Sequence, residues 1–113
     1  MSVTYAIRFA VRPEHRARFE RLLGGVLDRM RHEASFVDAA LHANPDDACD
    51  VLLVETWQSH EDVLAVQLGR DYRSEWHAAL EEILEKPREV SMWQRSRLDR
   101  AADQEAQAVP ASS

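Results

Sequence analysis

Residues 3–11 read VTYAIRFAV, and this stretch decides the fold because its apolar side chains alternate with other residues. Successive side chains of a β-strand point to opposite faces, so alternation of this kind predicts a strand. One face is entirely apolar and consists of Val3, Tyr5, Ile7, Phe9 and Val11. The opposite face carries a threonine, an arginine and two alanines. We therefore expect a sheet that is buried on one side and partly covered on the other.

A long amphipathic helix is predicted to follow this strand. Pro13 suits the first turn of a helix, and Glu14 follows near the positive end of the helix dipole. Apolar residues then recur at spacings of three and one, which places them on one stripe of a helix about five turns long. The stripe consists of Phe19, Leu22, Leu23, Val26, Leu27 and Met30.

A β-hairpin is predicted in the middle of the chain. A strand from Phe36 to Ala43 ends at the sequence NPDD of residues 44–47, which is a strong turn signal. A strand from Asp50 to Trp57 follows after a short connection, as expected for a hairpin. Its nearly continuous apolar character indicates a central strand that is covered on both faces.

Further helical signals lie between residues 59 and 87. Ser59 is suited to cap a helix, with Asp62 three residues later as the acidic partner of a capping box. Gly69 divides the region into a helix that runs through Leu68 and a second helix that ends at Pro87. The region therefore counts as one helical layer in two pieces.

A fourth strand, from Val90 to Arg95, completes the order β-α-β-β-α-β. This order predicts an α+β fold of the ferredoxin-like type, in which a four-stranded antiparallel sheet carries its helices on one face. We assign residues 1–97 to this domain. Residues 98–113 form a polar tail, which we expect to be flexible because it is rich in alanine, aspartate, glutamine and serine.

The sheet face without helices predicts a homodimer. Both faces of the first and third strands carry apolar residues, and a soluble monomer rarely exposes a large apolar patch. Two such sheets can cover each other through a two-fold contact. We therefore expect two copies to pair face to face.

Composition narrows the classes of partner. The chain has 113 residues, which is the size of one domain, and a net charge of −6. Its arginines are scattered and form no basic run, which argues against nucleic acid as a partner. No apolar stretch approaches the roughly 20 residues that a bilayer requires, so we expect no membrane association.

The sequence also lacks signals for export and for metal binding. Strand-like sequence begins almost at Met1, so we expect no signal peptide and a cytoplasmic location. The single cysteine, Cys49, cannot form an internal disulfide. No two histidines have the helical spacing of metal ligands, so we predict no metal.

Several segments together resemble the antibiotic biosynthesis monooxygenase family. The resemblance covers about residues 3 to 97 and is carried by the turn NPDD (44–47), the segment LLVETWQS (52–59), the pair Gln67-Leu68 and the segment PREV (87–90). The resemblance implies a dimeric α+β barrel. It also implies oxidation of a small phenolic, quinol or polyketide-type aromatic with O₂, with no cofactor, because the substrate supplies the electrons.

Two site residues follow from this resemblance. Trp57 falls at the family's third-strand tryptophan, which is thought to contact substrate, although a tryptophan at a strand end can equally serve the core. Tyr72 stands where many relatives have a histidine, which makes it a catalytic candidate; the alternative is a packed tyrosine with a satisfied hydroxyl. Leu53 replaces a polar amide of some oxygenating relatives, which leaves open a non-catalytic protein that binds a hydrophobic metabolite.

Four further residues complete the predicted site. His77 can exchange protons near neutral pH and is the second catalytic candidate; the alternative is an imidazole that faces solvent. Trp76 precedes it on the apolar stripe. Arg8 lies between small alanines and could steady a phenolate, or it could pair with an acid such as Glu55. His42 is predicted to face either the helices or the dimer contact. Trp57, Trp76, Arg8 and His42 are thus the expected substrate contacts.

Overall fold

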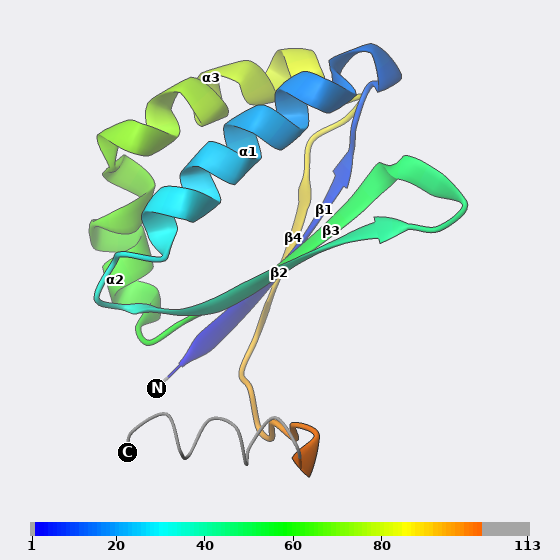
Figure 1. Cartoon of the computed structure of the whole chain (residues 1–113). Coiled ribbons are helices and arrows are strands. Elements are labelled where there is room, and N and C mark those ends of the chain that lie inside the picture. The colour runs from blue at the N-terminus through cyan, green and yellow to red at the C-terminus, as the bar shows by residue number, and fades with distance from the viewer. Residues whose placement is uncertain (1, 103–113) are drawn as a thin grey trace.

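The computed structural model describes residues 2–102, in which helices cover one side of a four-stranded antiparallel sheet (Figure 1). The order of strands across the sheet is β2-β3-β1-β4. Both central strands pair on either side, and the predicted ferredoxin-like α+β architecture is confirmed. The strands are β1 (Val3–Ala10), β2 (Phe36–Asn44), β3 (Asp47–Trp57) and β4 (Glu89–Trp93).

The helical layer begins and ends close to the predicted boundaries. The long helix is α1 (Arg16–Met30), preceded by a single 3₁₀ turn. Ser59 caps α2 (His60–Ala65) as predicted, because its hydroxyl accepts a hydrogen bond of 3.1 Å from the backbone N–H of Asp62. The α-helical part ends earlier than Leu68, and two 3₁₀ turns lead into α3 (Ser74–Ile83).

The apolar face of β1 forms the core together with the helices. Strand β1 is antiparallel to β3 with Tyr5 opposite Glu55 and Ile7 opposite Leu53, so the buried apolar residues of both strands share one face. Phe9 meets α1 and α3, where its ring lies 5.2 Å from that of Phe19 and 5.7 Å from that of Trp76. The apolar residues that alternate along residues 3–11 are therefore buried on one face of the sheet, as predicted.

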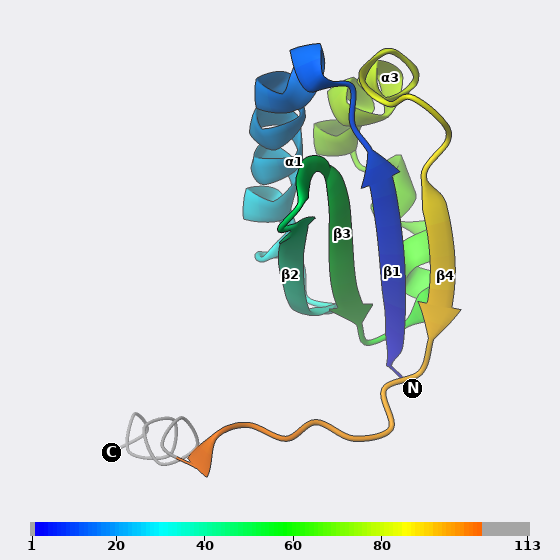
Figure 2. The same ribbon diagram turned by 90° about the vertical axis from the view of Figure 1, so that its right-hand side faces the viewer.

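The opposite face of the sheet, called here the outer face, has no helix over it among residues 2–102 (Figure 2). Leu52 is 38% exposed on this face and lies opposite Arg8 in the strand pairing. The chain's own helices thus cover β3 on one face, whereas the apolar run of β3 predicts cover on both. Arg8 pairs with Asp50 through two hydrogen bonds of 2.8 Å, and not with Glu55, because Glu55 points to the helix face.

The last described segment leaves the sheet after β4. Strand β4 ends at Trp93, two residues before the predicted end, and Arg95 instead contacts Asp38 of β2 at 3.0 Å. Most of the tail predicted for residues 98–113 lies outside the described residues, which end at 102. Within residues 2–102, no helix combines the length and the apolar character needed to cross a bilayer.

Candidate active site

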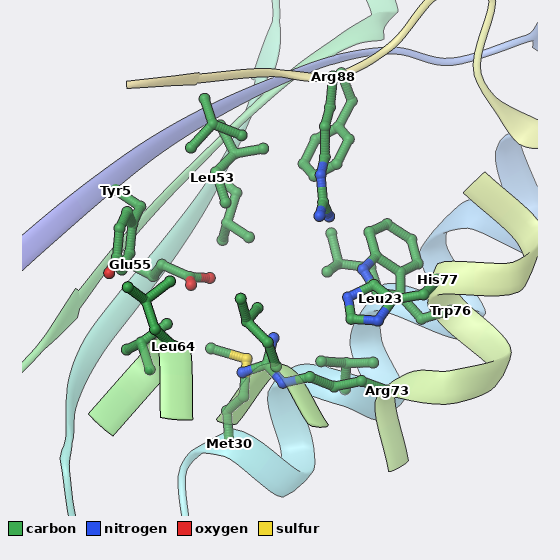
Figure 3. A pocket seen from close by; sticks show the side chains of 16 residues that line it. Tyr5, Leu23, Met30, Leu53, Glu55, Leu64, Arg73, Trp76, His77 and Arg88 are labelled. Carbon is green, nitrogen blue, oxygen red and sulfur yellow. The ribbon is translucent and has the colours of Figure 1, made fainter. Parts of the chain in front are cut away.

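A cavity of about 220 Å³ lies between the helix face of the sheet and the helices. Strands β1 and β3 supply its floor, and α1, α2 and α3 supply its walls. Most of the lining is apolar, with Ile7, Phe9, Leu23, Val26, Met30, Leu53, Val63 and Trp76 among the side chains. Polar groups enter this apolar space at a few points: Tyr5, Glu55, Arg73, His77 and Arg88 (Figure 3). An apolar cavity with a few converging polar groups is the usual form of a small-molecule site.

Glu55 brings a carboxyl group into the cavity from the middle of the sheet. It is 6% exposed, because alternation along β3 places it on the helix face beside Leu53 and Trp57. Burial raises the pKa of this carboxyl, although a hydrogen bond of 3.1 Å from the indole N–H of Trp57 opposes the rise. Glu55 is therefore a group that can exchange a proton closer to neutral pH than an exposed glutamate.

Arg73 enters the cavity from the 3₁₀ turn before α3 and is also 6% exposed. Its guanidinium carbon lies 5.8 Å from the ring centre of Trp57 and 5.7 Å from that of Tyr72. Two of its nitrogens, Nε and Nη2, find no hydrogen-bond acceptor among residues 2–102. The arginine thus lies over aromatic rings while these two nitrogens stay without a hydrogen-bond partner.

His77 and Arg88 reach the cavity from α3 and from the segment before β4. The pKa of His77 is lowered, first by burial and then by the positive charges of Arg88 and Arg73. The imidazole is therefore neutral at pH 7 and can accept a proton. Figure 3 shows the side chains of Glu55, Arg73, His77 and Arg88 around the same space.

Tyr72 is close to this site but directed away from it. Its hydroxyl donates a hydrogen bond of 2.9 Å to Glu33, which also pairs with Arg70. Burial and the bond to Glu33 both raise the pKa of Tyr72. Tyr72 does not belong to the cavity lining, and its predicted catalytic role stays a prediction.

Trp57 lies under the cavity floor and not in its lining. Its side chain has 0% exposure, and its ring contacts Phe36 edge to face with a centroid distance of 5.3 Å. It touches the site through Glu55 and Arg73. The sequence offered two roles for Trp57, a substrate contact or a core residue. The structure adds a third role, in which Trp57 positions the charged groups of Glu55 and Arg73.

The remaining predicted contacts divide between the two faces of the sheet. Trp76 lines the cavity together with His77, and its predicted contact with substrate stays a prediction. Leu52 of β3 lies opposite Arg8 of β1 and, on its other side, opposite His42 of β2. Because Leu52 is on the outer face, Arg8 and His42 are on that face too. The structure therefore brings together His77 and Trp76, and it separates Arg8 and His42 from them by the thickness of the sheet.

Three charged residues of the cavity do not follow from the sequence prediction of the site: Glu55, Arg73 and Arg88. Glu55 shares the parity of Leu53 and Trp57, so strand alternation places it on the same face as these two residues. Arg73 precedes Trp76 by three residues and His77 by four, a spacing that indicates a shared helix face. Arg88 lies in an irregular segment, where no periodic pattern reports its direction.

Metal ligation has no candidate in the described part of the chain. Among residues 2–102, no three His, Cys, Asp or Glu side chains gather in a way that could hold a metal ion. The chemistry that the arrangement offers is proton transfer by Glu55 and His77 and charge stabilisation by the two arginines.

The sequence matches the family model "Antibiotic biosynthesis monooxygenase" over residues 2–79. This match covers more than half of the chain, and the chain belongs to this family. No curated protein matches the sequence.

Solved structures of the same fold are numerous. Rv0793 from Mycobacterium tuberculosis is 24% identical with a TM-score of 0.76, and the alignment covers 90% of this chain and 100% of that one. SnoaB from Streptomyces nogalater, described as a cofactor-independent oxygenase, is 20% identical with a TM-score of 0.73, and the alignment covers 86% and 95%. A conserved protein from Methanosarcina mazei is 18% identical with a TM-score of 0.76, and the alignment covers 85% and 94%. These likenesses establish the fold.

Proposed function

We propose that this chain is a cofactor-independent monooxygenase that oxidises a small phenolic, quinol or polyketide-type aromatic with O₂. The proposal rests on one observation: this chain, which belongs to the family, has an apolar cavity whose wall contains the carboxyl group of Glu55 and the neutral imidazole of His77. SnoaB, a cofactor-independent oxygenase of the same fold, supports the reaction class.

The proposed reaction begins with a proton transfer. His77 is neutral at pH 7 and lines the cavity, so it can take the proton of a phenolic hydroxyl. The phenolate is electron-rich and gives its electrons to O₂. When a phenol becomes a quinone, the ring loses two hydrogens and gains one oxygen atom, and the other oxygen atom leaves as water. The substrate supplies all the electrons.

The cavity walls have two tasks in this scheme. Phe9 and Trp76 are aromatic and can hold a flat ring, and the aliphatic residues of α1 keep bulk water from the anion. Arg73 and Arg88 are permanent charges that stabilise negative charge in a region of low dielectric constant.

We further propose that the protein is a homodimer that pairs through the outer face of the sheet. This face carries Ala6 opposite Val54 and Ala40 opposite Val54, so its centre is small and apolar. In the described part of the chain, no helix covers this face (Figure 2). A two-fold contact would bury this strip.

A second function is favoured by one observation. Leu53 lines the cavity where a polar amide would assist oxygen chemistry in some relatives, and an apolar wall suits simple binding of a hydrophobic metabolite. In this case the protein would hold its ligand without turnover.

Oxygen consumption separates the two functions. We expect substrate-dependent O₂ uptake with a panel of anthrones and hydroquinones, a large decrease in His77→Ala, and unchanged uptake in His32→Ala, whose imidazole is exposed at the end of α1. Ligand-induced thermal stabilisation without uptake in any member of the panel would favour the binding function.

A further inference from the structure

We propose that the cavity takes an aromatic acid and that Arg73 holds its carboxylate. This inference rests on the proposed function, since it takes the cavity as the substrate site, and it adds the class of substrate. The juxtaposition that carries it is a buried arginine with an open hydrogen-bonding edge beside an apolar, aromatic wall.

The open edge of Arg73 is the first step. Its side chain is 6% exposed, yet Nε and Nη2 have no acceptor within residues 2–102. A buried donor without an acceptor is unfavourable. The aromatic rings of Trp57 and Tyr72 support the plane of the guanidinium, but they offer no acceptor to these two N–H groups. A ligand that accepts both hydrogen bonds would remove this cost.

The two open nitrogens define the shape of the acceptor. Nε–H and Nη2–H of a guanidinium point in parallel from one edge and match the two oxygens of a carboxylate. The same protein shows this pairing elsewhere, where Nε and Nη2 of Arg8 each bind one carboxylate oxygen of Asp50 at 2.8 Å. Arg73 has the same two nitrogens unpaired at the wall of the cavity, where neighbouring atoms cover them, so a small turn of the side chain would bring this edge to a carboxylate.

The charge of the cavity also favours an anion. Two arginines, Arg73 and Arg88, line it together with the single carboxyl group of Glu55. The ion pairs within residues 2–102 do not include either arginine. A ligand with one negative charge would bring the site closer to neutrality, and desolvation by the apolar walls would strengthen its attraction to Arg73.

The size and the walls of the cavity indicate the rest of the ligand. About 220 Å³ is below the range of roughly 300–1,000 Å³ that suits drug-sized molecules. Phe9 and Trp76 provide aromatic surface within this space. The expected ligand is therefore an acid with one to three fused aromatic rings.

Binding of two isosteric probes tests the inference without any turnover. The probes are 2-naphthoate and the neutral 2-naphthamide, and their affinities are measured by calorimetry at pH 7.5. We expect the wild-type protein to bind the naphthoate about tenfold or more tightly than the amide. Arg73→Met should lose this preference while it keeps its affinity for the amide. Arg73→Lys, which retains the charge but not the paired donors, should keep only part of it.

The matched control is Arg29→Met, which removes an exposed arginine from α1 and should leave both affinities unchanged. Thermal unfolding establishes that each variant is folded; if Arg73→Met does not fold, the wild type and Arg73→Lys decide. Equal binding of the two probes by the wild type, no binding of naphthoate, or an unchanged preference in a folded Arg73 variant would overturn the inference.

The outcome is distinguishable from that of the oxygenase test. Selective binding of naphthoate, with no O₂ uptake in the presence of any aromatic, would support the acid-binding site and contradict the monooxygenase proposal. Efficient O₂ uptake with neutral aromatics, but no preference for naphthoate, would keep the monooxygenase and remove the acid site.

Discussion

The indole N–H of Trp57 donates a hydrogen bond of 3.1 Å to a carboxylate oxygen of Glu55, two residues earlier on the same strand face. Both side chains are buried, and only the carboxyl group of Glu55 reaches the cavity. Trp57 therefore acts on the site by fixing the direction of Glu55 and by supporting the guanidinium of Arg73. One indole ring therefore positions two charged residues of the site.

Replacement of Trp57 by alanine should cost about 3–5 kcal/mol of unfolding free energy, because a large and fully buried ring is lost. Trp57→Phe should cost less, since it keeps most of the ring and loses the hydrogen bond. Urea denaturation measures both values. A loss well under 1 kcal/mol in Trp57→Ala, together with lost ligand affinity, would instead place the tryptophan in direct contact with the ligand.

Glu55→Gln should make the protein more stable at neutral pH and equally stable in acid. The folded protein raises the pKa of Glu55 through burial, so the protonated form is favoured on folding. That contribution is fully present below the ordinary glutamate pKa and is lost as the pH rises through the raised value. The amide oxygen of glutamine can still accept the hydrogen bond from Trp57.

The measurement for this variant is thermal unfolding between pH 4 and pH 8. The melting temperature of the wild type should fall relative to that of Glu55→Gln as the pH rises from the ordinary glutamate pKa through the raised pKa of Glu55. Parallel curves would show that Glu55 has the same pKa in the folded and unfolded states.

His77 and Tyr72 should differ in their effect on oxygen uptake. His77 lines the cavity, whereas the hydroxyl of Tyr72 is bound to Glu33, so we expect His77→Ala to lower the rate by about 100-fold or more and Tyr72→Phe to retain most of it. The pKa of His77 is below its ordinary value, and the base must be neutral. The rate should therefore fall only as the pH drops below about 6.5. A larger loss in Tyr72→Phe than in His77→Ala would reverse the assignment.

The outer face of the sheet should determine the oligomeric state. Val54→Arg places a charge at the centre of this face and should convert a dimer into a monomer in light scattering at micromolar concentration. Leu41→Arg is the matched control, because Leu41 lies opposite Leu53 on the helix face of the edge strand and is 45% exposed. A wild-type protein with the mass of one chain would contradict the proposed dimer.

The architecture follows from local patterns that the structure confirms. The alternation of β1, the apolar stripe of α1 and the Ser59 cap are each decided within a few residues, so the sequence specifies them directly. The boundary after Ala65 is different, because the chain changes there from an α-helix to 3₁₀ turns without a helix-breaking residue. Tertiary packing decides where such a helix ends.

The site can be predicted from the sequence less completely than the fold, because the faces of its residues depend on strand register. As long as the register of the two strands is unknown, Arg8 and Glu55 could pair across them. The observed register sets Tyr5 opposite Glu55, so the side chains of Arg8 and Glu55 lie on opposite faces of the sheet. Asp50 is then the acid within reach of Arg8. A register differing by one residue would exchange the two faces, and composition alone cannot make that choice.

Isotopic labelling tests the central claim most directly. The protein is incubated under ¹⁸O₂ with an aromatic substrate that supports oxygen uptake, and the product is analysed by mass spectrometry. The account predicts one labelled oxygen atom in the product, label in the released water, and strongly reduced product with His77→Ala. A product whose new oxygen comes from water, or no product above the uncatalysed reaction, would contradict it.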